Sequence, residues 1–307
     1  MKTVICDGNN LFSRSCYAAD SAPKQMTDDR GNWTGGVVIF ANMVGRLIRE
    51  LSPGRLAVVW DSGSSTYRKA LFPEYKAHRQ SSTIDGPTFS LAKELLTLIG
   101  AHQVWSPGVE ADDIISALAR RSTSHEVVIV SGDKDFLQLI SPKIKVYVPG
   151  TPEPMWNQNR FTAFYNIPPE WFSLVLAIAG DVVDGIPGVP RYGVKRAVKA
   201  LNKARRDMEV LFADDLVLAT RRELIERNLA LTDLSIEIEG TDVGPIPLFR
   251  LTKEGDLAWP ALMDFLNRHQ MKVLAARFEK GEFGQEQAHE AHPMDRAKFG
   301  QLPLLAG

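Results

Sequence analysis

The chain has 307 residues, 44% of them hydrophobic, and its 36 Lys and Arg residues nearly balance its 37 Asp and Glu residues. This length is enough for one large domain or two of ordinary size, and the apolar content excludes disorder for most of the chain. A formal net charge of −1 is not the basic charge typical of a nucleic-acid-binding protein, so the charges have to be considered segment by segment.

The N-terminal segment MKTVICDGNN lacks the long apolar stretch of a signal peptide, and no run of 18 apolar residues could span a membrane. The two cysteines, Cys6 and Cys16, favour buried thiols over a disulfide or a metal site. We therefore expect a soluble monomer of a reducing cytoplasm, with no membrane partner.

Short β-branched runs predict buried parallel strands at residues 3–6, 56–60, 127–130 and 144–148. Between them, apolar spacing near 3.6 predicts helices at 36–51, 88–99 and 111–120. This alternation predicts an α/β fold with a mostly parallel sheet flanked by helices. After about residue 165 only helical patterns follow, at 169–180, 192–204, 208–214 and 219–230. We therefore expect an α/β domain over 1–167, a helical domain over 168–280, and a polar tail over 281–307.

Three aspartates follow predicted strands. Asp7 comes directly after the first strand, Asp61 after the second, and Asp133 after the third and a Ser-Gly turn. Open α/β sheets bind ligands just beyond the carboxyl ends of their strands. These three side chains are therefore expected to meet at one edge of the sheet.

More acids lie at helix starts and turns, in the segments GVEADD, SGDKD and GDVVDG. Each segment alone is explained as well by a helix cap or an Asx turn. Gathered together, however, the carboxylates would repel one another unless a cation lay between them, and all-oxygen ligands suit Mg²⁺ or Mn²⁺. Nine acids exceed the needs of one ion, which favours two ions and the hydrolysis of a phosphodiester. The candidate metal ligands are Asp7, Asp61, Glu110, Asp112, Asp113, Asp133, Asp135, Asp181 and Asp184.

Two basic segments are candidates for nucleic-acid binding. The first, TYRKALFPEYKAHR at 66–79, mixes cations with aromatic residues, as single-strand-binding surfaces do, although a solvated helix with a partly buried aromatic face explains it equally well. The second, DGIPGVPRYGVKRAVKALNKARR, carries cations without an intervening acid beside a turn that precedes a helix, and this favours binding to a phosphate backbone. The expected DNA contacts are Arg68, Tyr75, Lys76, Arg79, Gly188, Arg191, Gly193, Lys195, Arg196 and Lys199.

Over roughly residues 2–240, the motifs of the chain resemble, in their order and spacing, those of the 5′ nuclease or flap endonuclease family. This family includes phage 5′ exonucleases and the 5′ nuclease domain of bacterial DNA polymerase I. The motifs are VICDGNN, TGGV, VVWDSG, LFPEYKAHR, GVEADD, SGDKD and LAIAGDVVDGIPGVPRYGVKRA. The resemblance implies a PIN-like fold, a helical arch near 64–90 that holds the 5′ single strand, and a helix-three-turn-helix over 181–201 that grips duplex DNA. The nine candidate metal ligands match the metal-site acids of the family.

The same resemblance implies catalytic roles for Lys76 and Arg79 near the scissile phosphate, a stacking role for Tyr75, and a K⁺ ion at the helix-three-turn-helix. Two departures from the family pattern matter. The family usually has Gly at the position of Arg191, which puts the bend of the hairpin and its K⁺ site in question. Some members carry Lys at the position of Leu176, so one active-site cation is absent or supplied elsewhere.

We therefore expect a two-metal 5′ nuclease that cuts 5′ flaps and degrades duplex ends 5′ to 3′, in replication, repair or phage DNA metabolism. Its place would be the cytoplasm of a bacterium or of a phage-infected bacterial cell. The alternatives are a PIN-like ribonuclease and a non-catalytic junction-binding protein. The segment QLPLL, Gln301 to Leu305, resembles a peptide that docks on the sliding clamp, and a chance apolar tail is the alternative there.

Overall fold

The structure is a computed structural model that describes residues 1–21, 26–63, 65–78, 84, 86–205 and 207–283. Its six-stranded sheet has the order β3-β2-β1-β4-β5-β6. The first five strands in the chain are parallel, and β6 runs antiparallel to β5. This confirms the predicted mostly parallel sheet. The strands are β1 (Lys2–Asp7), β2 (Arg55–Val59), β3 (His102–Val104), β4 (Glu126–Val130), β5 (Ile144–Tyr147) and β6 (Met155–Trp156).

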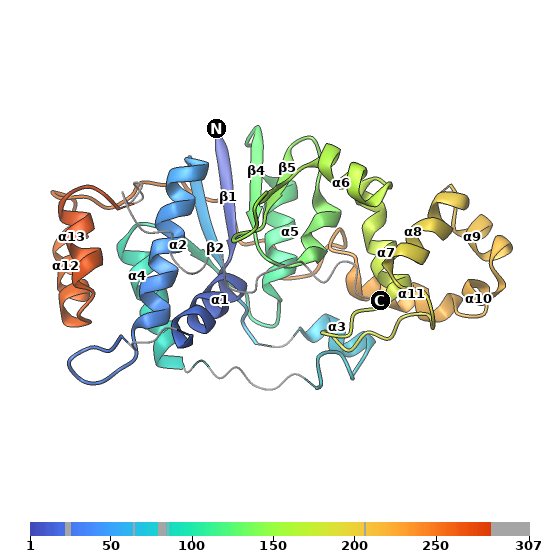
Figure 1. The fold of residues 1–307 in the computed structure, drawn as a ribbon, viewed down its shortest axis with the longest axis horizontal. Coiled ribbons are helices and arrows are strands. Elements are labelled where there is room, and N and C mark those ends of the chain that lie inside the picture. The colour runs from blue at the N-terminus through green and yellow to red at the C-terminus, as the bar shows by residue number, and fades with distance from the viewer. Residues whose placement is uncertain (22–25, 64, 79–83, 85, 206, 284–307) are drawn as a thin grey trace.

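Helices cover both faces of the sheet (Figure 1). Val4 and Cys6 of β1 pack into the core formed with α1 (Gly8–Asp20), α2 (Gly35–Leu51) and α4 (Gly86–Leu98). Ile5 belongs to the core on the other face, which includes α5 (Ala111–Arg121) and the 3₁₀ helix η1 (Lys134–Leu139). A strand buried on both faces has no polar side, which is why the strand sequences are continuous apolar runs. Both cysteines are buried and form no disulfide, as predicted.

The second core continues from the sheet into the helical part of the chain. Phe172 and Val175 of α7 (Phe172–Ala179) belong to the same apolar cluster as Ile129 of β4 and Phe136 of η1. The expected boundary near residue 167 therefore does not divide the hydrophobic core. The other elements of this part are α6 (Gln158–Tyr165), η2 (Pro169–Trp171), α8 (Val194–Lys203), α9 (Met208–Asp214), α10 (Leu216–Ala219) and α11 (Arg222–Thr232).

The last two described helices return to the first part of the chain. Leu262 and Phe265 of α12 (Trp259–Arg268) and Leu274 of α13 (Lys272–Glu279) pack in the core of α2 and α4. In Figure 1 they lie at the opposite end of the molecule from α8 to α11. The expectation of one helical unit over 168–280 is therefore wrong, because the apolar faces of α12 and α13 are buried against the α/β layer. No helix of the described residues is long and apolar enough to cross a membrane.

Candidate active site

The central strands bring the first three predicted acids to one edge of the sheet. Asp7 is the last residue of β1, which pairs in parallel with both β2 and β4. Asp61 follows β2 by two residues and Asp133 follows β4 by three. The charges of Asp61 and Asp133 both act on Asp7, so the predicted convergence of these three acids is confirmed.

Backbone and side-chain donors fix these carboxylates. Oδ1 of Asp7 accepts a hydrogen bond from the backbone N–H of Asn10 (3.0 Å), and Oδ2 accepts one from the Ser131 hydroxyl (2.7 Å). Oδ1 of Asp61 accepts from the backbone N–H of Ala111 (2.8 Å), at the start of α5. Asp133 caps η1 by accepting from the backbone N–H of Asp135 (2.9 Å). The cap that the SGDKD segment suggested is thus present at Asp133, whereas Glu110, the N-cap of α5, makes no side-chain cap bond.

Four of the acids, Asp7, Asp112, Asp133 and Asp135, form what we call the open group. Burial raises the pKa of Asp7 to about 7, although its bonds from Asn10 and Ser131 oppose the rise. Burial also raises the pKa values of Asp112, Asp133 and Asp135, and the charges of neighbouring acids add to the effect. Oδ1 of Asp135 is buried and accepts no hydrogen bond. Within the described residues, no Lys or Arg forms an ion pair with these four carboxylates.

A second set of acids, the paired group of Glu110, Asp113, Asp181 and Asp184, has cations of the chain itself as partners. Arg68 lies between two of them: Nη1 is 2.8 Å from Oε2 of Glu110, and both Nη atoms contact Asp113, at 2.6 and 2.8 Å. Its Nε donates to the carbonyl of Leu231 (2.8 Å), and the residue is only 3% exposed. The prediction that Arg68 contacts DNA is therefore wrong. Its guanidinium is buried and donates its hydrogen bonds to Glu110, Asp113 and Leu231 of the same chain.

Lys76 and Tyr75 also face the paired group. Nζ of Lys76 is 2.5 Å from Oε1 of Glu110 and 3.7 Å from Oδ2 of Asp184. The Tyr75 hydroxyl lies 3.0 Å from Oδ2 of Asp184 and 3.2 Å from Oε2 of Glu110. Tyr75 is 3% exposed, so this buried ring does not offer the expected stacking surface. Arg79, the other predicted catalytic cation, lies outside the described residues.

Lys134 is a cation of the site that sequence reasoning missed. Its Nζ is 2.9 Å from Oδ2 of Asp181. Burial alone would raise the pKa of Asp181, but the hydrogen bond and charge of Lys134 lower it. Leu176, by contrast, is fully buried in the apolar core, so that position offers no cation to the acidic edge. The motif contained the signal, since Lys134 stands between two of the predicted ligands.

The turn between α7 and α8 is shaped by glycine. A Cβ on Gly188 would lie 2.0 Å from the carbonyl oxygen of Ala179, so this predicted DNA-contact position has no room for a side chain. Arg191 has φ of +72°, the left-handed region that glycine adopts without strain. The hairpin thus takes the glycine-type bend even with arginine at this position.

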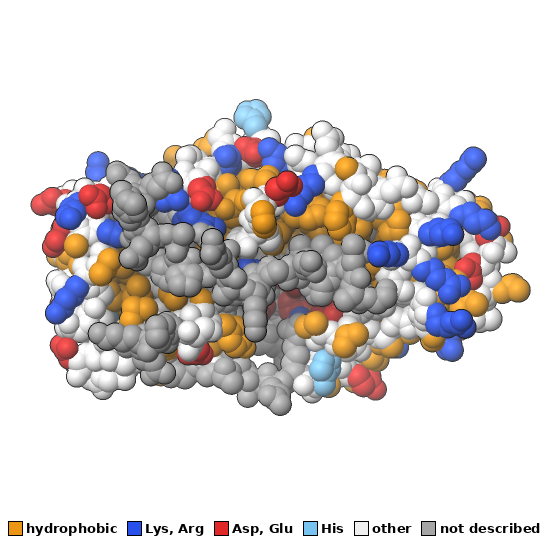
Figure 2. All heavy atoms as spheres, in the orientation of Figure 1, with side chains coloured by type: hydrophobic (Ala, Val, Ile, Leu, Met, Phe, Trp, Pro, Cys, Tyr) orange, Lys and Arg blue, Asp and Glu red, His pale blue; other side chains and the backbone are white. Residues whose placement is uncertain are grey.

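The predicted cations of the second basic segment all reach the surface. Arg191, Lys195, Arg196 and Lys199 are exposed, and Gly193 is the N-cap of α8. Arg196 lies over the ring of Tyr192, 4.0 Å from its centroid. Figure 2 shows lysine and arginine side chains gathered at the end of the molecule that holds α8 to α11. This surface can offset the charge of a phosphate backbone.

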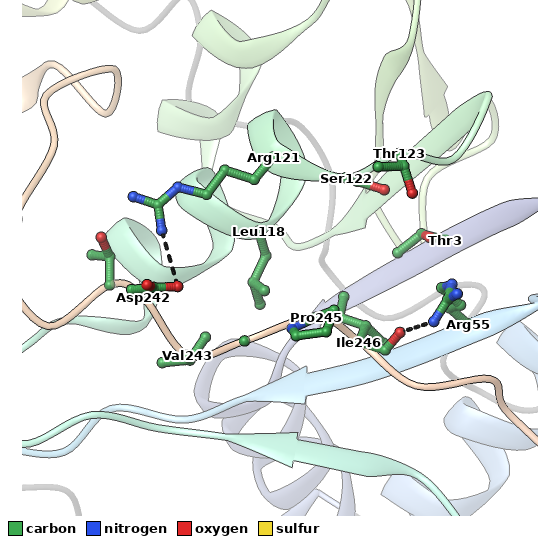
Figure 3. Close-up of a pocket in the computed structure, with 12 residues that line it drawn as sticks. Thr3, Arg55, Leu118, Arg121, Ser122, Thr123, Asp242, Val243, Pro245 and Ile246 are labelled. Carbon is green, nitrogen blue, oxygen red and sulfur yellow. Dashed lines mark hydrogen bonds and ion pairs between the residues drawn. The ribbon is translucent and has the colours of Figure 1, made fainter.

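A cavity of about 250 Å³ lies at the other end of the strands, between the starts of β1 and β2, the end of α5 and residues 241–246 (Figure 3). Arg121 reaches Asp242 across it (3.6 Å), and none of the predicted site residues lines it.

Among the described residues, no three His, Cys, Asp or Glu side chains are gathered as a ready metal site. The carboxylates therefore influence one another's pKa values without forming a compact ligand set.

The structure is thus an open α/β sheet with carboxylates at the carboxyl ends of its central strands, beside a basic helical module. Residues 2–166 match the family model described as the 5′-3′ exonuclease, N-terminal resolvase-like domain. The chain therefore belongs to the 5′-3′ exonuclease family, a family of nucleases.

Relatives in sequence agree with this assignment. The chain is 29% identical over 289 residues to a 5′-3′ exonuclease of Bacillus subtilis, covering 91% of this chain and 96% of that one. It is 32% identical over 288 residues to DNA polymerase I of Rhizobium leguminosarum, covering 89% of this chain but only 28% of the polymerase. The similarity thus spans nearly the whole exonuclease and less than a third of the polymerase.

Solved structures share the fold. A bacteriophage T5 D15 flap endonuclease, in a complex with DNA and metal ions, matches with a TM-score of 0.66 at 21% identity, over 87% of this chain and 99% of that one. Flap endonuclease-1 from Methanococcus jannaschii matches with a TM-score of 0.58 at 13% identity, over 91% of each chain. At these identities the likeness shows the shared fold alone.

Proposed function

We propose that this chain is a divalent-metal-dependent 5′ nuclease that cuts 5′ single-stranded flaps and degrades duplex ends 5′ to 3′, in replication, repair or phage DNA metabolism. The observation that carries the proposal is the open group: burial, together with the charges of neighbouring acids, raises the pKa values of Asp7, Asp112, Asp133 and Asp135, and one oxygen of Asp135 is buried without a partner. Such a group is stable in its charged form when a cation lies among its oxygens.

The donor set fits hard ions. Carboxylates without His or Cys partners suit Mg²⁺ or Mn²⁺, and the T5 D15 structure that shares this fold contains metal ions. Two bound ions would supply a water of lowered pKa and neutralise the charge of the departing oxygen. Asp7, Asp112, Asp133 and Asp135 would hold them, with Asp61 beside Asp7. The Ser131 hydroxyl and the Asn10 amide keep Asp7 oriented.

The paired group has a different task in this proposal, which is to position cations around the reacting phosphate. Lys76 is held on both sides: its side chain contacts Glu110, and its backbone N–H donates to the carbonyl of Asp184 (2.9 Å). Its φ of +53° costs about 1–2 kcal/mol in a non-glycine residue. Strain of this kind persists where the surroundings fix it, often at functional sites. We assign Lys76, together with Arg79, to the scissile phosphate.

Duplex DNA would lie on the basic surface of α8. The exposed Lys195, Arg196 and Lys199 would contact phosphates, and the N-terminal amides of α8 at Gly193 would hold one more. Because the turn before α8 takes the glycine-type bend at Arg191, a K⁺ ion held by its carbonyls remains part of the proposal. Binding through phosphates would be independent of sequence and sensitive to salt.

Titration of Mg²⁺ and of Mn²⁺ on three 5′-labelled substrates tests the proposal: a 5′ flap, a blunt duplex and a single-stranded RNA. We expect no cleavage in EDTA, cleavage of the flap near its junction as the metal is added, shortening of the duplex from its 5′ end, and an intact RNA. Preferential cleavage of the RNA would support the PIN-like ribonuclease instead. Tight flap binding without cleavage at any metal concentration would support the junction-binding alternative.

The remaining proposals concern partners and location. The segment Gln301–Leu305 lies outside the described residues, and docking on a sliding clamp stays a proposal for it. Deleting residues 298–307 should weaken clamp binding while leaving flap cleavage intact, and unchanged clamp binding would refute the docking role. We also propose that the protein acts as a monomer in the cytoplasm of a bacterium or a phage-infected bacterial cell.

A further inference from the structure

Trp105 is an exposed aromatic residue at the acidic edge of the sheet that the site described above does not use. It follows β3 directly and is 56% exposed. The neighbouring strand β2 ends one residue before Trp60, whose backbone N–H donates to the carbonyl of Val104 (2.9 Å). Trp105 therefore lies level with Trp60, the residue that precedes Asp61 of the acidic edge.

A lysine joins the two tryptophans. Nζ of Lys93 in α4 is 5.1 Å from the ring centroid of Trp60 and 5.9 Å from that of Trp105. Trp60 is fully buried, whereas more than half of the Trp105 side chain is exposed to solvent. An ammonium beside an exposed indole is a pair that nucleic-acid-binding surfaces use, since the ring stacks on a base and the cation offsets phosphate charge.

Hydrogen bonds of Gln103 tie β3 to α4 and to Trp60 beside this pair. The side-chain amide of Gln103 donates to the carbonyl of Lys93 (2.8 Å), and its oxygen accepts from the indole N–H of Trp60 (2.9 Å). Because side chains two apart in a strand share a face, Trp105 points to the same side as Gln103. Beyond Trp105, the carbonyl of Gly108 accepts from the backbone N–H of Thr66 (3.2 Å), where α3 (Thr66–Leu71) begins. The backbone that carries Trp105 is thus held between α4 and the start of α3.

We propose that Trp105 and Lys93 form a stacking platform for an unpaired nucleotide of the 5′ strand. Trp105 presents its ring to the base, and Lys93 faces the adjoining phosphate. This inference rests on the proposed 5′ nuclease function and adds a residue that sets the preference for flapped substrates.

The position of the platform decides which part of the substrate it meets. β3 is the edge strand on one side of β1, and the basic helix α8 lies on the other side (Figure 1). A duplex held at α8 therefore reaches the acids from one side, and the strand that continues past them leaves toward α4. Bases within a duplex already stack on their neighbours, so an exposed ring has a free base face only in the unpaired part.

The test compares Trp105→Ala with the wild-type enzyme on two DNA substrates, a 5′ flap and a blunt duplex without unpaired nucleotides. We expect KM for the flap to rise about tenfold more than KM for the duplex, with similar kcat values, since stacking on one base is worth roughly that factor. Trp105→Phe should restore most of the flap preference. Phe164→Ala serves as the matched control, because Phe164 is an exposed aromatic (49%) on α6, away from α3 and the acidic edge in Figure 1.

A second readout does not depend on cleavage. With 2-aminopurine at the first unpaired position of the flap and EDTA present, binding to the wild-type protein should quench its fluorescence, and Trp105→Ala should abolish the quenching. Equal KM changes on both substrates, or quenching that persists in Trp105→Ala, would overturn the platform. Failure of the wild-type enzyme to cut any DNA would instead overturn the proposed function, so the two failures are distinguishable.

Discussion

The open group and the paired group both consist of carboxylates near the acidic edge of the sheet, but they differ in whether a cation of the chain pairs with them. Glu110 and Asp113 contact the buried Arg68, and Asp181 contacts Lys134. Asp7, Asp112, Asp133 and Asp135 have no such partner among the described residues, and their pKa values are raised. A carboxylate whose charge is balanced within the chain holds a cation of the chain in place, whereas on the proposed function an unbalanced one would bind a cation from solution.

Asp112 and Asp113 are adjacent in the sequence, yet Asp112 belongs to the open group and Asp113 to the paired group. They are neighbours in the first turn of α5, but a helix turns by about 100° per residue, so their side chains point in different directions. Asp113 meets the guanidinium of Arg68, and Asp112 meets the charges of Asp133 and Asp7. The role of each acid thus depends on the face of the helix rather than on the motif.

The largest expected effect is on catalysis by the open group. Replacing both Asp133 and Asp135 with Asn should lower the cleavage rate more than about a hundredfold, because losing even a hydrogen-bond partner of a metal ligand typically costs 10–100-fold. Flap affinity, measured by fluorescence anisotropy in EDTA, should remain, since the exposed cations of α8 are untouched. Persistent cleavage by the double variant would contradict the proposal that the open group, unlike the paired group, holds the metal ions.

The next largest effect is on the free energy of unfolding, which we expect to fall in Asp113→Asn and to rise in Asp112→Asn. Asp113→Asn leaves the buried guanidinium of Arg68 with less compensation, and breaking such a pair costs about 3–5 kcal/mol. Asp112→Asn removes a charge that its neighbours repel, so in EDTA it should stabilise the fold. Urea unfolding of both variants measures the difference. Equal changes would show that Asp112 and Asp113 have equivalent surroundings.

The pH dependence of stability gives a third, smaller effect. Because the pKa of Asp7 is about 7 in the fold and 3.8 for an ordinary aspartate of an unfolded chain, the native protein binds more protons between these values. In EDTA the free energy of unfolding should therefore rise as pH falls from about 8.5 to 6.5. Added Mg²⁺ competes with those protons, so its stabilisation should grow with pH. Urea midpoints that are constant over this range, with and without metal, would contradict the assignment.

The smallest effect concerns the half-buried pair of Lys134 and Asp181. Lys134→Met should cost about 1 kcal/mol in unfolding free energy, the upper end for partly exposed pairs. Lys145→Met, which removes a pair with Glu126 at the other edge of the sheet, is the matched control and should cost less. If both variants lose the same stability, Lys134 is an ordinary surface cation rather than part of the site.

The sequence predicted the central strands because each is buried on both faces and therefore reads as an unbroken apolar run. It did not predict β3, whose three residues, His102–Val104, carry no such run, nor α1, which begins with the polar Gly8, Asn9 and Asn10. The helices α12 and α13 were also missed. Their core contacts are with α2 and α4, more than 150 residues earlier in the chain, which no local pattern reveals.

The acidic edge was predictable because strand ends and acids coincide in the sequence. The division into open and paired groups was not. Arg68 belongs to a segment that looked like a nucleic-acid-binding surface, and only the tertiary fold shows that its partners are Glu110 and Asp113. Exposure of a cation depends on what packs over it, and residues 42 and 45 positions away do so here.

The return of the chain to its first layer has a consequence for folding. His269, in the turn between α12 and α13, lies 3.3 Å from Oδ2 of Asp28, a residue 241 positions earlier. Contacts of such separation form late, since a long loop must close before they contribute. During synthesis, the apolar surface of α2 and α4 that Leu262 and Phe265 cover stays exposed until residues 259–279 have left the ribosome. A fragment that ends near residue 166 should therefore be prone to aggregation and should bind a hydrophobic dye, even though it contains the whole sheet.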